Sequence, residues 1–365
     1  MTLNHKRRVL NLIEGKPVDR LPSDVWLSDR ATTKLSKALG VPPSELFTTL
    51  DNHFVIVAPL DNHKSWEDET TLAQALAAGY FRRPADGVIV DDWGVGWDTV
   101  HEGIYELSHP LQGDADIRAL CVPDPAGAHL FDPVEEAVRR YGGEYCVVGC
   151  QDLTLFERAC ALRGFDTFLV DLKVDTVFAE RLLDAIADYQ VALAEGLVSR
   201  GVDLGFTGGD YGTQHGLIIS TEDWLHFEAP RLKRVWDVYR AHGIPVMHHS
   251  CGNIAPLIPH MIKMGLDILN PIQHVMDPED LAARFGDSLV FFGGVDSQQL
   301  MTFGTPPEIE QEVARYAAVL GCGKGYIVAP DQCLLSSVPA ENVMAFVRAA
   351  RNQPSRRAGA RTEGG

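Results

Sequence analysis

The 365-residue chain lacks long apolar runs and an excess of positive charge. No stretch approaches the roughly 20 consecutive apolar residues that a membrane-spanning helix needs. The segment after Arg8, VLNLIEG, is too short and too polar for the core of a signal peptide. Lysine and arginine number 32 against 50 aspartates and glutamates, and the resulting net charge of -18 repels phosphate backbones and anionic lipids. We therefore expect no nucleic-acid or membrane partner and a cytoplasmic location.

Densely spaced cysteines and a nucleotide-binding loop are also missing. The seven cysteines are scattered along the chain, which argues against a disulfide framework. The motif GVGW at 94–97 neither follows a clear strand nor precedes a helix pattern, so nucleotide binding is rejected. We expect Cys146, Cys150 and Cys160 in the core, which leaves the question of which cysteines keep a metal-binding thiolate.

From Tyr145 onward, short apolar and β-branched runs alternate with longer amphipathic stretches. This alternation is typical of βα units around a parallel sheet, and it predicts an α/β fold of the (β/α)8 TIM-barrel type. The expected strands are 145–149, 204–209, 244–250, 268–272, 289–295 and 325–330. The expected helices are 4–14, 173–200, 222–242, 253–264, 307–320 and 340–351.

The amino-terminal part of the chain is irregular and rich in proline. We interpret residues 1–140 as an amino-terminal extension and cap with the first barrel elements, and 141–351 as the main βα units that carry the site. The polar, glycine-rich segment 352–365 is predicted to be a disordered tail. One catalytic domain is expected, since barrels of this length commonly form a single unit.

Several predicted strands end in residues that can bind a metal. His249 and Cys251 are two residues apart, so extended backbone places both side chains on one side, whereas His248 points to the other. Cys333 follows the last strand, and the carboxyl ends of parallel barrel strands share one face. Taken alone, a His-x-Cys pair is more often a core histidine beside a buried cysteine. The second thiol, Cys333, favours a zinc site with three protein ligands and an open position.

A glycine-rich loop and a helix supply the catalytic candidates. Asp210 lies in TGGDYGTQHG at a strand end, with Tyr211 and His215 as candidate substrate-binding residues, and the alternative for Asp210 is a simple turn. Glu157 lies on a helix after the first of these strands. It is a candidate general acid or base, and its alternative is a solvated or capping residue.

Three more residues are candidates for substrate binding. Trp93 in DDWGVGW is expected either to line a pocket or to anchor a hairpin. Asp296, which closes FFGGVD, either supports a metal-binding histidine or caps a helix. Gln273 ends the strand ILNPI.

The motifs around these residues resemble a known group of enzymes. The segments are HHSCGNIAPLIPHMIKMGLDILNPIQ (248–273), FFGGVDSQQLMTFGTPPEI (291–309), GYIVAPDQC (325–333), VPAENV (338–343) and KRRVLNLIEGKPVDRLP (6–22). They are similar to zinc-dependent, corrinoid-linked methyltransferases of the uroporphyrinogen decarboxylase superfamily. The resemblance implies a (β/α)8 barrel and zinc bound by His249, Cys251 and Cys333. It also implies methyl exchange with a cobamide on a separate corrinoid carrier protein.

Two departures refine this expectation. True uroporphyrinogen decarboxylases carry an arginine-bearing motif that resembles RQAGRY, whereas SDVWLSDRATTKL (23–35) contains only Arg30, which argues against decarboxylation. Cobalamin-independent methionine synthases are similar in their zinc chemistry and have a ligating glutamate where Gln273 stands here. A zinc ion with two thiolates and one imidazole is then formally neutral, which makes it the better Lewis acid.

The sequence thus predicts transfer of a methyl group from a small methoxylated compound to the cob(I)amide of a corrinoid protein. The alternatives are transfer from methylcobamide to a thiol, a uroporphyrinogen decarboxylase-like reaction, and a non-catalytic barrel that binds a corrinoid or tetrapyrrole. The methyl donor and homodimer formation are left open.

Overall fold

The computed structural model describes residues 2–66, 69–113 and 116–354. The chain forms two compact units, each built from segments that are distant in the sequence. The first contains Met1–Val55, Tyr141–Cys146 and Leu266–Gly365, and the second contains Ile56–Arg140 and Val147–Gly265. The predicted domain boundaries at residues 140 and 351 stay predictions. Most of the predicted tail, 355–365, lies outside the described residues.

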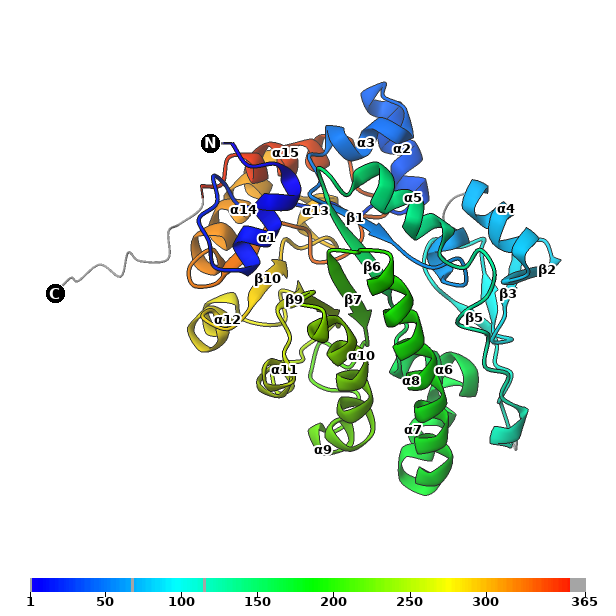
Figure 1. The fold of residues 1–365 in the computed structure, drawn as a ribbon. Coiled ribbons are helices and arrows are strands. Elements are labelled where there is room, and N and C mark those ends of the chain that lie inside the picture. Colours follow the sequence, from blue (N-terminus) through cyan, green and yellow to red (C-terminus); the bar gives the residue numbers. More distant parts are fainter. Residues whose placement is uncertain (1, 67–68, 114–115, 355–365) are drawn as a thin grey trace. The chain divides into compact units, whose positions relative to one another are not determined.

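The first unit contains three consecutive parallel strands with helices between them. The strands are β9 (Ile268–Ile272), β10 (Val290–Gly293) and β11 (Gly325–Ile327). Every residue of these strands is buried, which explains their nearly continuous apolar sequence. The helices are α12 (Pro278–Phe285), α13 (Leu300–Phe303), α14 (Pro306–Leu320) and α15 (Ala340–Arg351), and α14 packs against α15 (Figure 1). These strands and the longer helices confirm the predicted pattern.

A short extended segment lies beside β11 in the first unit. Ser23 and Leu27 form parallel bridges with Val328 and Leu334, although the segment is too irregular to count as a strand. The buried carboxylate of Asp24 accepts hydrogen bonds from the side chain of Trp26 at 2.6 Å and from the backbone of Phe54 at 3.4 Å. The stretch that replaces the arginine-bearing motif therefore has a structural role at this edge.

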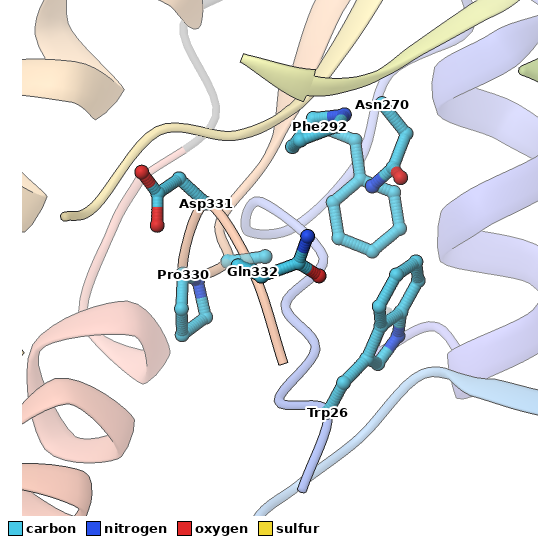
Figure 2. Close-up of a pocket in the computed structure, with 8 residues that line it drawn as sticks. Trp26, Asn270, Phe292, Pro330, Asp331 and Gln332 are labelled. Atoms are coloured by element: carbon cyan, nitrogen blue, oxygen red, sulfur yellow. The ribbon is translucent and has the colours of Figure 1, made fainter. Parts of the chain in front are cut away.

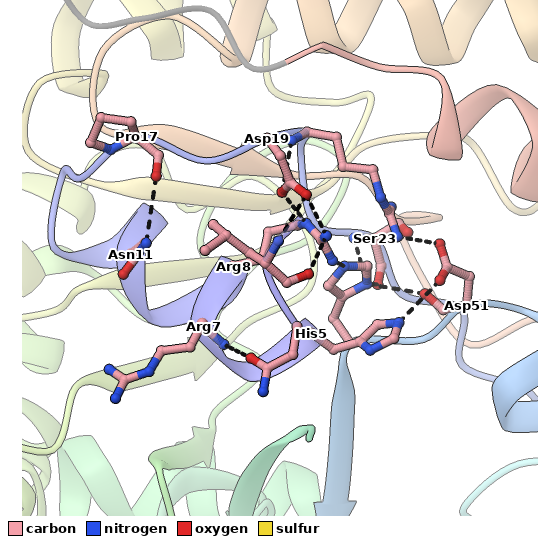
Figure 3. Close-up of polar contacts among 12 residues, drawn as sticks. His5, Arg7, Arg8, Asn11, Pro17, Asp19, Ser23 and Asp51 are labelled. Atoms are coloured by element: carbon pink, nitrogen blue, oxygen red, sulfur yellow. Dashed lines mark hydrogen bonds and ion pairs between the residues drawn. The ribbon is translucent and has the colours of Figure 1, made fainter. Parts of the chain in front are cut away.

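The amino-terminal helices of this unit are α1 (His5–Ile13), α2 (Asp29–Leu39) and α3 (Pro43–Thr49). Figure 3 shows the polar network that anchors α1. Arg8, which is buried, donates two hydrogen bonds to Asp19 at 2.7 and 2.9 Å, and its Nη1 lies 2.9 Å from Nε2 of His53. Arg20 pairs with Asp51 at 2.5 Å. The prediction of a helix over 4–14 is confirmed.

The second unit contains the parallel strands β6 (Cys146–Gln151), β7 (Leu204–Gly208) and β8 (Val246–His249). Its longest helix, α8 (Thr176–Ser199), has 24 residues and packs against α10 (Ala229–Ala241) (Figure 1). Its other helices are η1 (His63–Trp66), α4 (Glu69–Ala78), η2 (Ile117–Ala119), α5 (Asp132–Tyr141), α6 (Phe156–Arg163), α7 (Phe165–Val174), α9 (Thr221–Asp223), η3 (Trp224–Glu228) and α11 (Ile258–Met264). The three cysteines assigned to the core, Cys146, Cys150 and Cys160, are buried.

A four-stranded antiparallel sheet in the second unit was not predicted. Its strands are β2 (Phe81–Ala85), β3 (Val88–Asp91), β4 (Gly96–Asp98) and β5 (Glu106–Ser108). The DDWGVGW motif forms the turn between β3 and β4, where Asp91 accepts hydrogen bonds from the backbone of Val95 at 2.8 Å and from the indole of Trp97 at 2.9 Å. These bonds explain why this aromatic, glycine-rich segment is ordered.

The α/β class and the parallel sheet are confirmed. Over the described parts of the chain, seven strands belong to this sheet, namely β1 (Phe54–Val57) and β6 to β11. The eight-stranded barrel and the amino-terminal cap stay predictions, and segment 23–27 forms only isolated bridges with residues after β11. No helix within the described ranges is long and apolar enough to cross a membrane.

Candidate metal centre

The ends of β7 and β8 bring three metal-competent side chains together in the second unit. Gly208 is the register partner of His249, so the residues that follow the two strands meet at the same edge. Asp210 follows β7, and Cys251 follows β8 by two residues. The neighbouring His248 turns into the core, where its Nδ1 lies 2.9 Å from the hydroxyl of Thr207, so His249 is the histidine at this edge.

The geometry of this group fits a zinc ion. Sγ of Cys251 lies 3.4 Å from Nε2 of His249, and that nitrogen lies 3.6 Å from Oδ1 of Asp210. One donor atom from each residue lies within 4.8 Å of the others. Zinc binds sulfur at about 2.3 Å and nitrogen or oxygen at about 2.0–2.2 Å, so tetrahedral ligands stand about 3.4–3.7 Å apart. Asp210 was predicted as a catalytic residue, and the structure places it among the possible ligands.

Backbone packing fixes the loop that carries Cys251. The Cys251 amide donates to Oδ1 of Asp210 at 2.7 Å. Gly252 has a φ of +79°, and a Cβ atom there would lie 2.2 Å from the backbone of Gly212. The sequence Cys-Gly after β8 therefore lets the two loops approach backbone to backbone, which holds the donor atoms in place before any ion binds.

Glu157, on α6, is hydrogen-bonded to the backbone of Asp210. Its Oε1 accepts a hydrogen bond from the Asp210 amide at 3.1 Å, whereas its buried Oε2 has no hydrogen-bond partner among the described residues. Burial, and next the nearby charge of Asp210, raise the pKa of Glu157 well above its ordinary value. Its protonated form is therefore favoured, which suits a residue that stores a proton beside a reactive site.

A second buried carboxylate lies deeper in the same unit. Tyr211, which is fully buried, donates its hydroxyl to Oε2 of Glu228 at 3.1 Å, and its ring stacks on His248. Burial raises the pKa of Glu228 to about 7. The structure thus places the Tyr211 side chain in the core. Its contact with substrate stays a prediction.

Two further candidates, His215 and Trp93, lie in the second unit. His215 is exposed in the hairpin that Gly212 and Leu217 close. Trp93 is buried, with its ring 5.0 Å from that of Tyr189. This position matches the anchoring alternative better than a pocket wall.

Cys333, the third predicted ligand, belongs to the first unit. It is half-buried after β11, and its amide donates to Oε1 of Gln332 at 2.9 Å. Asp296 accepts the amides of Gln298 and Gln299, which is the capping geometry that the sequence left as an alternative. Gln273 is half-buried after β9.

The first unit also has a pocket that the sequence analysis missed. It is lined by Trp26, Asn270, Pro271, Phe292, Ala329, Pro330, Asp331 and Gln332 (Figure 2). Trp26 and Phe292 pack edge to face at 5.5 Å, and the Gln332 amide points toward them (Figure 2). The signal that could have found it is the position of Asn270 within β9, of Phe292 near the end of β10 and of Gln332 in the segment after β11.

Comparison with known proteins defines the class to which this fold belongs. The family model for uroporphyrinogen decarboxylase (URO-D) matches residues 88–353, and the chain belongs to this family. It is 22% identical to uroporphyrinogen decarboxylase of Enterobacter sp. (strain 638), covering 96% of the chain and 97% of that protein.

Relatives with a different activity are equally similar. The chain is 22% identical to the methylcobamide:CoM methyltransferase MtbA of Methanosarcina acetivorans, covering 95% of the chain and 97% of that protein. The solved structure of a methyltransferase from Methanosarcina mazei shares the fold, with a TM-score of 0.71 and 17% identity over 96% of this chain and 98% of that one. Family membership therefore leaves decarboxylation and methyl transfer to be decided by the site.

Proposed function

We propose that the protein is a metal-dependent methyltransferase that exchanges a methyl group between a small compound and a cobamide held by a separate corrinoid protein. The observation that carries this proposal is the grouping of His249, Cys251 and Asp210 at the ends of β7 and β8. A thiol and an imidazole in a family with a methylcobamide:CoM methyltransferase among its relatives suit this chemistry. The same donors have no evident task in decarboxylation.

The proposed zinc ligands are His249 and Cys251, with Cys333 as the third ligand on the strength of its sequence motif. Zinc bound there would lower the pKa of a coordinated thiol or polarise the oxygen of a methyl ether. The chain itself supplies the orientation of the ligands. The Asp210 carboxylate accepts a hydrogen bond from the Cys251 amide, and the Glu157 carboxyl accepts one from the Asp210 amide. These two hydrogen bonds position the loops that carry the ligands.

Asp210 favours one direction of transfer. The sequence argument for an ether substrate depended on the absence of a carboxylate, because Gln273 stands where a glutamate ligand was expected. The structure brings the carboxylate of Asp210 to 3.6 Å from Nε2 of His249. Added negative charge weakens Lewis acidity and makes a coordinated sulfur more electron-rich. A thiol acceptor of the methyl group is therefore our first proposal, and demethylation of a small methoxylated compound is the second.

In the thiol reaction, the methyl carbon forms a bond to sulfur as its bond to cobalt breaks, and the bonding electrons stay with cobalt. The thiol proton leaves before or during this step. Asp210 is 41% exposed, so it offers this proton a path to solvent. Burial raises the pKa of Glu157, which favours its neutral form and so limits further negative charge at the site. A cytoplasmic location and a homodimer remain predictions.

The test uses free cobalamins in place of the carrier protein. Methylcobalamin is mixed with a panel of thiols, and cob(I)alamin with a panel of methyl ethers, while the cobalamin absorption spectrum reports methyl transfer. Metal content is measured for wild type and for His249→Ala, Cys251→Ser and Cys333→Ser. Cys322→Ser is the matched control, because Cys322 is exposed and lies before β11.

We expect methyl transfer to thiols with zinc bound, and loss of both in the three ligand variants but not in the control. Transfer from an ether alone would replace the first proposal by the second. Decarboxylation of uroporphyrinogen without any methyl transfer, or stoichiometric zinc in all three variants, would refute the proposed function.

A further inference from the structure

A second group of metal-competent side chains lies at the strand ends of the first unit. His274 follows β9, Asp296 follows β10 and Asp331 follows β11, and one donor atom from each lies within 4.8 Å of the others. Nδ1 of His274 is 3.7 Å from Oδ2 of Asp331. None of these residues belongs to the proposed zinc site, and only Asp296 was selected from the sequence.

Each carboxylate uses one oxygen for hydrogen bonds to its surroundings. Oδ1 of Asp331 accepts the backbone amide and the hydroxyl of Ser297 at 2.9 and 2.6 Å. Oδ1 of Asp296 accepts the amides of Gln298 and Gln299 at 2.8 and 3.0 Å. No hydrogen bond from a described residue reaches Oδ2 of either aspartate. The two carboxylates are therefore fixed in orientation while one oxygen of each stays available.

The environment of Asp331 favours a positive partner. Its side chain is only 2% exposed, and burying a negative charge is costly unless that charge is paired. The separation of 3.7 Å from His274 is too long for a hydrogen bond. It suits two ligands that stand about 2.0–2.2 Å from one ion.

We propose that His274, Asp296 and Asp331 bind a divalent cation through one imidazole nitrogen and two carboxylate oxygens. This donor set suits Mn²⁺ or Zn²⁺, since imidazole favours transition metals and carboxylates favour harder ions. The two carboxylates neutralise the charge of the ion. His274 is 47% exposed, so solvent has access and water completes the coordination shell.

The position of Asp331 gives this ion a task. Figure 2 shows the Asp331 carboxylate directed away from Trp26 and Phe292, whereas the amide of the next residue, Gln332, is directed toward them. The ion therefore lies outside the pocket and ties the segment after β11 to the ends of β9 and β10. Because Gln332 also accepts the Cys333 amide, the ion would order both the pocket wall and the predicted third zinc ligand.

Manganese alone is the probe for this second site. The protein is stripped of metal, loaded with one equivalent of Zn²⁺, and titrated with Mn²⁺ while electron paramagnetic resonance measures the free ion. Asp331→Asn keeps an oxygen for both Ser297 hydrogen bonds but removes the charged ligand. His274→Ala removes the half-exposed ligand without disturbing the core. Asp277→Asn is the matched control, because this exposed aspartate caps α12 only three residues from His274.

We expect one Mn²⁺ per wild-type chain and a dissociation constant at least about tenfold higher in Asp331→Asn and His274→Ala, with the control unchanged. If Asp331→Asn fails to fold, His274→Ala decides the outcome. Equal binding in wild type and His274→Ala overturns the proposal. So does loss of Mn²⁺ binding in a His249→Ala, Cys251→Ser double variant, because the ion would then occupy the other cluster.

Discussion

The buried ion pair between Asp91 and Arg158 links the small antiparallel sheet to the helix beneath the candidate metal centre. The Asp91 carboxylate accepts a hydrogen bond from the Arg158 guanidinium at 2.6 Å, and the two side chains are 2% and 7% exposed. It also accepts hydrogen bonds from the indole of Trp97 and from the backbone amide of Val95. Arg158 is the neighbour of Glu157 on α6, so the pair holds the helix that supports Asp210.

Replacing Asp91 by alanine removes the carboxylate that is ion-paired with the buried Arg158 guanidinium. Removal of one partner of a buried pair costs about 3–5 kcal/mol in the free energy of unfolding. We therefore expect Asp91→Ala to lose stability in this range. Because α6 is then less firmly held, we also expect weaker metal binding at His249 and Cys251.

Urea unfolding followed by circular dichroism gives the free energy of unfolding by linear extrapolation. Asp116→Ala is the control, because Asp116 forms an ion pair with Arg118 on the surface, where both side chains are at least half exposed. We expect no measurable change in this control. A loss of less than about 1 kcal/mol in Asp91→Ala would refute the reasoning. So would a double-mutant cycle with Arg158→Ala that shows no coupling between the two side chains.

Three further predictions concern residues around the candidate metal centre. Because burial raises the pKa of Glu228 to about 7, the folded state gains stability below the ordinary value of 4.5 and loses it as the pH rises toward 7. Glu228→Gln should therefore gain up to about 3 kcal/mol relative to wild type between about pH 5 and about pH 8, and a pH-independent difference in urea unfolding would contradict this. Asp210→Ala should weaken zinc binding about 10- to 100-fold in a competition titration with a chelator, and Asp210→Asn should weaken it less, since the amide oxygen can still hold the Cys251 amide. Gly252→Ala should lower both thermal stability and zinc affinity because its Cβ would meet backbone at 2.2 Å, whereas Gly243→Ala, at a similar φ of +68° in open space, should leave zinc affinity unchanged.

The strands and helices of the βα units could be predicted because their local patterns are strong. Apolar, β-branched runs gave β6 to β11 close to their observed bounds, and amphipathic stretches gave α8, α14 and α15. The pairing of His249 with Cys251 also followed from local geometry, since alternation along a strand places both on one side. These features depend on a few neighbouring residues and not on the rest of the fold.

The antiparallel sheet from Phe81 to Ser108 could not be predicted in the same way. Its strands are three to five residues long, and one of them contains a proline. Their conformation depends on the buried hydrogen bonds that Asp91 accepts from Trp97 and Arg158. Arg158 is 67 residues away in the sequence. No local pattern contains that contact.

The sequence by itself determined the α/β class, the order of the βα units and two donors of the candidate metal centre, because each is encoded by residue spacing along one strand or helix. Only the tertiary structure decided that Asp210 joins His249 and Cys251, that Tyr211 belongs to the core, and that His274 and Asp331 meet. The physical reason is that a parallel sheet brings the ends of strands together that are tens of residues apart, while the conformation of each loop beyond a strand depends on backbone contacts with the next loop. The contact of Gly252 with Gly212 is of this kind, and the spacing of either residue in the sequence does not reveal it.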